Sequence, residues 1–350
     1  EVSVRRLANT HVEILFNDRG RIEHFLDRAT GRSIFKHGQI GNRLQAFRDR
    51  PAVYDAGDID ADFEDQVFEI DDLVQAEVVE RGPMRAAIRF EWRYENSRIV
   101  QVVALEADAR QVEFDTFVEW YEHNTLVKTA FPLDLHAAAV DAEIQFGHVR
   151  RATHRNTSWD KARFECVMQR WVDVTEPDFG VAFLNDSKYG YDARGTDIRL
   201  TLLRSPTYPW PEADQGEHRF RYALMVHDGD KDVVHMAAED FNLPLRLIAG
   251  ATASDAPAPK MAPLLHVLTE GIAVEAVKEA EDGDGIVVRL WETTGRHRSA
   301  EIALAPDFTQ AALIDLLEEP ISSLALQPQS LQVAFKPFEI ISLKLGRSAT

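Results

Sequence analysis

Apolar and polar side chains alternate along much of the first two thirds of the chain. Residues 88–95 read "IRFEWRYE", in which apolar and charged residues take turns. The same two-residue period recurs in "VEFDTFVEW" at 112–120, "DIRLTL" at 197–202 and "FRYALMVH" at 220–227. In a β-strand this period places the apolar side chains on one face and the polar side chains on the other. We therefore predict an all-β protein whose antiparallel sheets each keep one solvated face.

Helical signal is confined to one short stretch. In "DVVHMAAEDF", residues 232–241, Val233, Ala237 and Phe241 recur at four-residue spacing, which predicts a short amphipathic helix. The later segment "AGATASDAPAPK" is rich in small residues and proline, which is typical of a linker, and strand-like patterns resume after it. The predicted organisation is a large β domain over 1–248, a linker over 249–262 and a small C-terminal β-sandwich over 263–350.

The charge balance narrows the classes of partner. The 350 residues include 39 Lys and Arg against 58 Asp and Glu, which gives a formal net charge of -19. Such a charge repels phosphate backbones, so no nucleic-acid partner is expected. No apolar run is long enough to span a membrane, so no membrane partner is expected either. The single Cys166 suits a reducing compartment, and a cytoplasmic location is expected. Because the chain starts "EVSVRRLANT" without Met or a signal peptide, it is expected to be either processed or part of a longer polypeptide.

Few familiar catalytic signatures are present. The sequence has no GxSxG elbow, HExxH motif, phosphate loop or GxGxxG turn. The stretch 228–239, "DGDKDVVHMAAE", places acidic residues as in part of a calcium loop, but Val233 stands where the loop needs glycine. A turn followed by a helix with acidic residues in its first turn explains the same letters. A lone cysteine such as Cys166 is more often inert packing than a nucleophile.

Two segments combine aromatic rings with many hydrogen-bonding groups. Residues 153–165 read "THRNTSWDKARFE" and contain almost no aliphatic side chain. Residues 184–218 hold three tyrosines and Trp210 among Asn, Asp, Lys, Arg and Gln side chains. Aromatic faces beside planar polar groups are the usual surface for gripping sugars. The alternative is a long hairpin whose aromatic residues only cap a sheet.

Several blocks of the sequence resemble one enzyme family. They are "EIQFGHVRRATHRNTSWDKARFE", "FGVAFLNDSKYGYDARG", "IRLTLLRSPTYPWPEADQGEHRFRYAL" and the closing "KPFEIISLKL". These blocks are similar to the C-terminal half of glycoside hydrolase family 38 α-mannosidases, above all to the cytosolic and bacterial branch. The resemblance extends from about residue 17 to 345.

The resemblance implies a fold and a division of labour. The family's C-terminal region is a galactose-mutarotase-like supersandwich followed by a smaller β-sandwich. Its zinc ligands and aspartate nucleophile belong to an N-terminal catalytic domain, so no catalytic residue and no metal ligand is expected in this chain. The resemblance implies that the parent enzyme uses zinc or another divalent metal and hydrolyses terminal α-mannose with retention of configuration. The implied partners are the N-terminal catalytic domain and a mannose-containing oligosaccharide.

In this interpretation the chain supplies scaffold and part of the sugar cleft, and alone it is inactive. The alternatives are a stand-alone carbohydrate-binding module and a structural domain that forms homo-oligomers. In the first segment the residues expected to face the cleft or the catalytic domain are His154, Arg155, Asn156 and Trp159. The competing view is an internally satisfied loop with Trp159 in the core. In the second segment the candidates are Tyr189, Tyr191, Asp192, Arg194, Arg204, Asp214 and Gln215.

Overall fold

The computed structural model describes residues 1–247 and 263–347. They form two compact units. The first comprises Glu1–Ile144 and Val149–Leu243, and the second comprises Gln145–His148 and the chain from Pro244 onward. The predicted linker over 249–262 lies outside the described residues.

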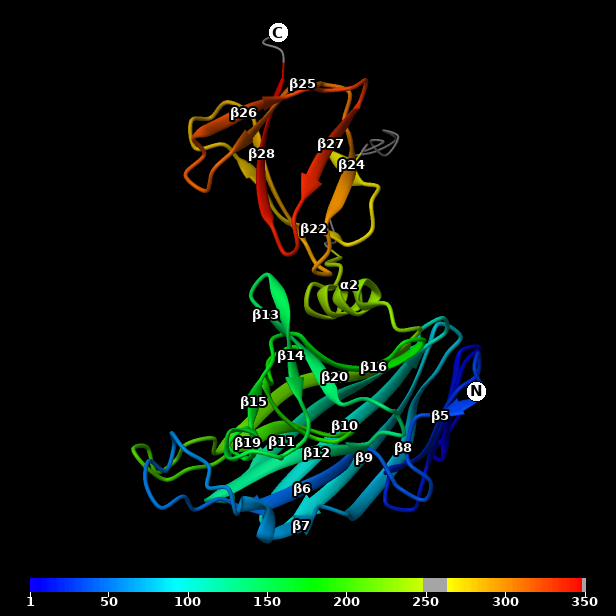
Figure 1. Ribbon diagram of the computed structural model, residues 1–350. Coiled ribbons are helices and arrows are strands. Elements are labelled where there is room, and N and C mark those ends of the chain that lie inside the picture. Colours follow the sequence, from blue (N-terminus) through cyan, green and yellow to red (C-terminus); the bar gives the residue numbers. More distant parts are fainter. Residues whose placement is uncertain (248–262, 348–350) are drawn as a thin grey trace, which may run out of the picture. The chain divides into compact units, whose positions relative to one another are not determined.

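The first unit contains a nine-stranded sheet that carries the clearest alternation (Figure 1). In β9 the side chains of Ile88, Phe90 and Trp92 are buried, as the two-residue period predicts. Each of the strands β16, β17, β20, β11, β10, β9 and β8 pairs antiparallel with the next one in this series. In spatial order the strands are β14 (Gly147–Ala152), β13 (Ala139–Ile144), β16 (Trp171–Glu176), β17 (Phe179–Asn185), β20 (Gly216–His227), β11 (Gln111–Trp120), β10 (Ser97–Glu106), β9 (Arg85–Tyr94) and β8 (Asp72–Arg81).

A six-stranded antiparallel sheet packs against the nine-stranded sheet. The ring of Phe131 on this sheet lies 5.0 Å from the ring of Phe183 and 6.3 Å from that of Phe114, both on the larger sheet. The strands of the six-stranded sheet are β15 (Cys166–Val167), β18 (Gly190–Arg194), β19 (Asp197–Arg204), β12 (Thr125–Pro132), β6 (Arg43–Arg48) and β7 (Val67–Glu69). A five-stranded sheet completes the unit: β1 (Val2–Ser3), β2 (Arg6–Ala8), β3 (Val12–Phe16), β4 (Ile22–Asp27) and β5 (Arg32–Ser33).

The described residues contain little helix. A 3-10 turn, η1 (Phe63–Asp65), and a short helix, α1 (Ser158–Lys161), lie in loops of the first unit. The predicted helix is α2 (Lys231–Asn242), but its buried face differs from the expected one. Val234, Ala238 and Phe241 are buried, whereas Val233 is exposed. The spacing of four and then three residues follows the helical period of 3.6 more closely than two steps of four, so two of the three predicted positions shift by one residue.

The second unit is a β-sandwich, as expected from the sequence. Val288 and Leu343 on one sheet share a buried core with Ile302 and Leu331 on the other. One sheet contains β21 (Leu265–Val267), β24 (Arg298–Leu304) and β27 (Ser330–Phe335). The other contains β22 (Ile272–Glu279), β23 (Ile286–Glu292), β28 (Ile340–Arg347), β25 (Phe308–Ile314) and β26 (Pro320–Leu324). The prediction of an all-β chain, in which two stacked sheets are followed by a smaller β-sandwich, is therefore confirmed.

Candidate functional site

The face of the six-stranded sheet that points away from the core carries charged side chains. Successive residues of a strand point to opposite faces. Because Phe131 lies in the core between the two large sheets, Lys128 and Ala130 on the same strand point to the other face. Lys128 lies opposite Thr201 on β19, and Asp192 on β18 lies opposite Arg199. The strand register thus brings residues from distant parts of the sequence into one layer.

Lys128 is at the centre of this layer and is fully buried. Its ammonium group donates to the Asp192 carboxylate at 2.8 Å, to the Thr201 hydroxyl at 2.9 Å and to the Glu165 carboxylate. The Arg199 Nε donates to both oxygens of Asp192, at 2.8 and 3.1 Å. A buried charge is costly unless it is paired and hydrogen-bonded. These contacts satisfy that condition for Lys128 and for Asp192.

Glu64 extends the layer into the surrounding loops. Its carboxylate, in η1, accepts hydrogen bonds from Arg199 and from Arg155, the latter at 2.9 Å. Burial opposes the charged form, but the hydrogen bond from Arg155 and the charge of Arg199 outweigh it and lower the pKa of Glu64. Two loops are therefore held on the sheet by ion pairs. We call this set the charged layer: Glu64, Lys128, Arg155, Glu165, Asp192 and Arg199.

A small pocket opens beside the charged layer. Its volume is about 240 Å³. Its floor includes Ala130, and Arg194 at the end of β18 contributes to its wall. We call it the polar pocket, and the residues that define it are Arg43, Glu64, Ala130, Asp192, Arg194, Asp197 and Arg199.

The loop 153–165 is ordered by its own polar groups and by the charged layer. Thr157 caps α1 by accepting from the Asp160 backbone N–H, and the Asp160 carboxylate accepts from Thr157 in return. His154 Nδ1 lies 3.3 Å from the same carboxylate. Trp159 is not in the core, because 78% of its surface is exposed, and Asn156 is exposed as well. The loop thus satisfies much of its hydrogen bonding internally and still presents an aromatic ring to the outside.

Arg204 fastens a second loop, residues 49–62. Its guanidinium forms an ion pair with the buried Asp49 and donates to the backbone carbonyls of Asp55 at 2.8 Å, Ala56 at 3.2 Å and Asp58. Burial raises the pKa of Asp49, and the contact with Arg204 opposes that shift. Arg204 therefore holds a carboxylate and a loop in place, and these contacts occupy Nε and both terminal nitrogens, which leaves little of the guanidinium for sugar hydroxyls.

Asp55 joins this loop to the segment after β19. Its carboxylate accepts from the backbone N–H of Thr207 at 2.6 Å and of Tyr208 at 2.9 Å. Although burial opposes it, these bonds lower the pKa of Asp55. The joined loops expose three aromatic rings, Tyr54 (78%), Tyr208 (71%) and Trp210 (64%). Figure 1 shows both loops at the same end of the first unit.

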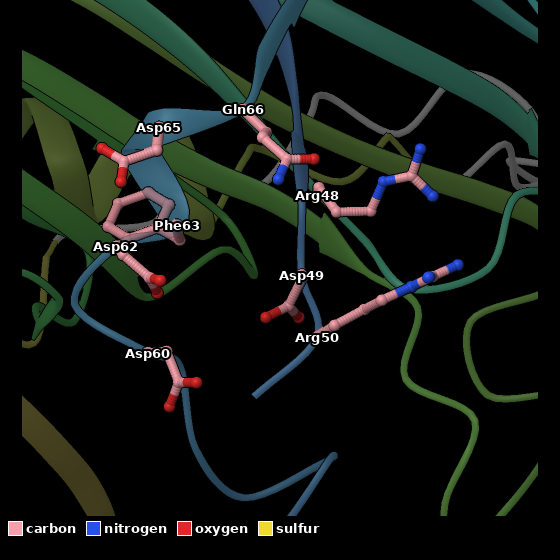
Figure 2. Close-up of a pocket in the computed structure, with 8 residues that line it drawn as sticks. All are labelled: Arg48, Asp49, Arg50, Asp60, Asp62, Phe63, Asp65 and Gln66. Carbon is pink, nitrogen blue, oxygen red and sulfur yellow. The ribbon is translucent and has the colours of Figure 1, made fainter. Parts of the chain in front are cut away.

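A second cavity, of about 440 Å³, lies beside this loop (Figure 2). Figure 2 shows the guanidinium groups of Arg48 and Arg50 pointing away from the carboxylates of Asp62 and Asp65. Asp60 also lines the cavity, and its carboxylate accepts from a backbone N–H of the loop. In the described parts of the chain, no three His, Cys, Asp or Glu side chains are grouped to hold a metal ion. Asp230, from the calcium-like stretch, instead caps α2 by accepting from the Asp232 N–H at 3.0 Å.

The remaining predicted site residues lie apart from the charged layer. Tyr191 is buried in the core, its hydroxyl accepts from Arg151 at 3.0 Å, and burial raises its pKa to about 12. Tyr189 is exposed. Gln215 donates to the Glu122 carbonyl at 2.8 Å, and Asp214 is exposed with its backbone oxygen 2.9 Å from the His218 ring.

The structure thus places only three of the predicted residues, Arg155, Asp192 and Arg194, in the charged layer or the polar pocket. Of the charged layer, sequence reasoning missed Glu64, Lys128, Glu165 and Arg199. Lys128 had a signal: it is the only charged residue in the run "TLVKTAFP", and a charge in a buried strand needs partners. No local pattern pointed to Glu64 or Arg199, because their contact joins positions that are 135 residues apart in the sequence.

Comparisons with known proteins agree with this architecture. The model of the glycosyl hydrolases family 38 C-terminal domain matches residues 7–212. This chain belongs to that family. The model of the family 38 C-terminal beta sandwich domain matches residues 271–343, within the second unit. The resemblance inferred from the sequence is therefore confirmed.

The relatives are much longer proteins. The chain is 36% identical to alpha-mannosidase 2C1 of Homo sapiens over 97% of its own length and 33% of the relative's length. It is 33% identical to alpha-mannosidase G of Dictyostelium discoideum, covering 83% of this chain and 27% of that protein. The chain thus spans about a third of the length of these relatives. The crystal structure of an alpha-mannosidase from Enterococcus faecalis V583 superposes with a TM-score of 0.80 at 18% identity, covering 98% of this chain and 42% of that one, which shows a shared fold.

No helix among the described residues is long and apolar enough to cross a membrane.

Proposed function

We propose that this chain is the non-catalytic C-terminal region of a longer α-mannosidase, a retaining glycosidase that acts on terminal α-linked mannose. The observation that carries the proposal is the match to two C-terminal family 38 domains together with coverage of about a third of relatives named alpha-mannosidases. The proposed partners are an N-terminal catalytic domain of the same polypeptide and a mannose-containing oligosaccharide. Zinc or another divalent metal would be bound by that domain, and the proposed location is the cytoplasm.

The geometry of the first unit supports a scaffold role. The charged layer and the Arg204 contacts hold two loops on one sheet, and these loops present Trp159 and Tyr54 to the outside. Binding residues often lie on loops that a rigid scaffold positions. We propose that His154, Asn156 and Trp159 face the catalytic domain or its cleft. A partner domain would cover the exposed ring of Trp159 and supply hydrogen-bond partners for Asn156.

The test compares this chain with the full parent polypeptide in hydrolysis of a chromogenic α-mannoside. Zinc or cobalt is supplied and then removed with a chelator, and the β-mannoside serves as the control substrate. We expect metal-dependent cleavage of the α-mannoside by the parent alone. Metal-dependent turnover by this chain would place the catalytic groups within it and contradict the division of labour. A parent that leaves the α-mannoside intact would contradict the proposed activity.

A stand-alone carbohydrate-binding function is the second candidate. The observation that favours it is the set of exposed rings on the joined loops, Tyr54, Tyr208 and Trp210, since aromatic faces stack on the C–H faces of sugars. Retention of the chain on a mannan column, weakened by the Trp210→Ala substitution, would support this role. Elution in the void volume would contradict it. Sedimentation of the isolated chain tests self-association, the third function considered.

A further inference from the structure

We propose that the polar pocket is a saccharide-binding site of its own, which takes a single pyranose ring and performs no catalysis. The site goes beyond the proposed scaffold role, because binding there needs only residues of this chain. The choice of mannose as the first probe rests on the proposed function, whereas the existence of the site does not.

The size of the pocket limits the ligand. Its volume of about 240 Å³ is below the range of about 300–1,000 Å³ typical of pockets for drug-sized ligands. A single sugar ring is of suitable size, and an oligosaccharide could place only one of its residues inside. The pocket exists because Ala130 is small. In the sheet register this residue lies between Arg43 on β6 and Arg199 on β19, and its methyl group leaves open the space between these two long side chains.

The lining of the pocket is suited to a ring that has both hydroxyl groups and C–H faces. Ala130 and Pro132 contribute apolar surface, and polar groups surround it. Such a combination orients a ligand through a few polar contacts while an apolar surface excludes water. A purely apolar ligand would leave the buried Asp192 carboxylate and the neighbouring guanidinium groups in contact with hydrocarbon, which is unfavourable.

The charges of the pocket favour a neutral ligand. Three guanidinium groups, those of Arg43, Arg194 and Arg199, face three carboxylates, those of Glu64, Asp192 and Asp197. The local charge is therefore balanced within a chain whose net charge is -19. A polyanion would meet the three carboxylates, and a cation would meet the three guanidinium groups, whereas the hydroxyl groups of a sugar can both donate to carboxylates and accept from guanidinium groups.

Arg194 is the side chain that we expect to bind the sugar directly. Arg199 is occupied by Asp192 and Glu64, Arg43 is paired with Glu69, and Asp197 is paired with Lys36. For Arg194 the described residues provide no hydrogen-bond or ion-pair partner to its side chain, which lies at the exposed end of β18. A planar guanidinium offers parallel N–H donors, and two adjacent ring hydroxyls can accept them.

The experiment uses the methyl group of Ala130 as a reporter. The whole chain is labelled with 13C in its alanine methyl groups and titrated with methyl α-D-mannopyranoside, and the Ala130 signal is assigned by its loss in the Ala130→Ser variant. We expect a saturable shift of this signal with a dissociation constant of about 1 mM, typical of a weak complex worth about 4 kcal/mol. The signal of Ala300, buried in the second unit, should stay in place.

Two substitutions test the pocket, and one is the control. Ala130→Leu, which fills the floor, should abolish binding detected through the other alanine signals and through saturation transfer to the sugar. Arg194→Ala should weaken binding at least tenfold, whereas Arg93→Ala, at an exposed position of the nine-stranded sheet, should leave it unchanged. Arg194 is exposed, so its replacement should leave folding intact even if Ala130→Leu disturbs it.

The proposal would be overturned by the absence of a shift of the Ala130 signal at 50-fold excess over the expected constant, about 50 mM sugar, or by unchanged affinity in Arg194→Ala. Titration with an open-chain hexitol is the specificity control, and equal affinity for it would refute a site built for a ring. The result is separate from the α-mannosidase assay. A parent enzyme that hydrolyses mannosides while this pocket stays empty would refute only the site, and an inactive parent whose pocket binds sugar would refute only the proposed activity.

Discussion

The clearest test of the charged layer is the removal of its central charge by Lys128→Met. The Lys128 ammonium is fully buried and has three partners. Methionine keeps most of the apolar length of the side chain, so the substitution removes the charge with little change in packing. Removing one partner of a buried ion pair typically costs about 3–5 kcal/mol, because the other charge is left without compensation.

The contacts of the partners place the expected cost at the lower end of that range. Asp192 keeps both hydrogen bonds from Arg199 Nε. Glu165 has 23% of its side chain exposed and can be rehydrated. We therefore expect a loss of about 3 kcal/mol in the free energy of unfolding, or about 6–12 °C in Tm for a domain of this size.

Unfolding in urea, followed by tryptophan fluorescence, measures this loss. Five of the six tryptophans lie in the first unit, so the signal reports mainly on the unit that contains the charged layer. Lys161→Met is the matched control, because Lys161 is exposed on α1 and should change stability by less than about 0.5 kcal/mol. If the free energy of unfolding of Lys128→Met lies within that same margin of the unsubstituted chain, the buried ion pairs do not contribute as argued. If the ion pairs do contribute, the double substitution Lys128→Met with Asp192→Asn should lower the free energy of unfolding by less than the sum of the two single substitutions, since the two groups are in contact.

Three further predictions concern the loops. Arg204→Ala should release the loop 49–62, because Asp49 loses its ion pair and the loop carbonyls lose their donor. Limited proteolysis should then cut that loop at least tenfold faster. Equal cleavage rates would show that other contacts hold the loop. The pKa of Glu64 is lowered in the folded state, so its contribution to stability is complete above the unfolded value and is lost as the pH falls through the folded pKa. The Tm difference between the unsubstituted chain and Glu64→Gln should therefore be largest near pH 7 and shrink below about pH 4.5. A difference that does not depend on pH would contradict the stabilising role of the Glu64 ion pairs. Trp159→Ala should change the Tm of this chain by less than about 2 °C because the ring is exposed. In the full-length enzyme the same substitution should lower activity if the loop faces the catalytic domain. Full activity of that variant would show that Trp159 does not lie in the interface.

The strands were predictable from the sequence because their signal is local. In β9, each residue's face follows from its neighbour, and the buried side chains of Ile88, Phe90 and Trp92 are those the alternation selects. The same rule separates Tyr191 from Asp192, which are adjacent on β18. The tyrosine points into the core, and the aspartate points to the charged layer. Applying the alternation to the sequence "GYDAR" would have predicted that only one of the two faces outward.

The partners within the charged layer could not be predicted in this way. Arg155 meets Glu64 across 91 positions of the sequence, and Lys128 meets Asp192 across 64. Such contacts depend on strand order and on the conformation of two loops, neither of which leaves a periodic trace in the sequence. Lys128 itself could be recognised as a residue in need of partners, but the identity of those partners required the fold.

The two loops are held on the sheet by ion pairs, although apolar contacts could cover the same face. A small apolar cluster of Phe47, Phe63 and Leu126 lies on the same side of the sheet, so the fold can cover this face with hydrocarbon. Replacing buried ion pairs by well-packed apolar residues is often neutral or stabilising. Ion pairs, however, form only in a narrow range of geometries, so they favour one position of each loop over its alternatives. We infer that Glu64 and Arg155 serve to fix the position of the two loops more than to increase stability, which is the property that a surface presenting fixed aromatic rings requires.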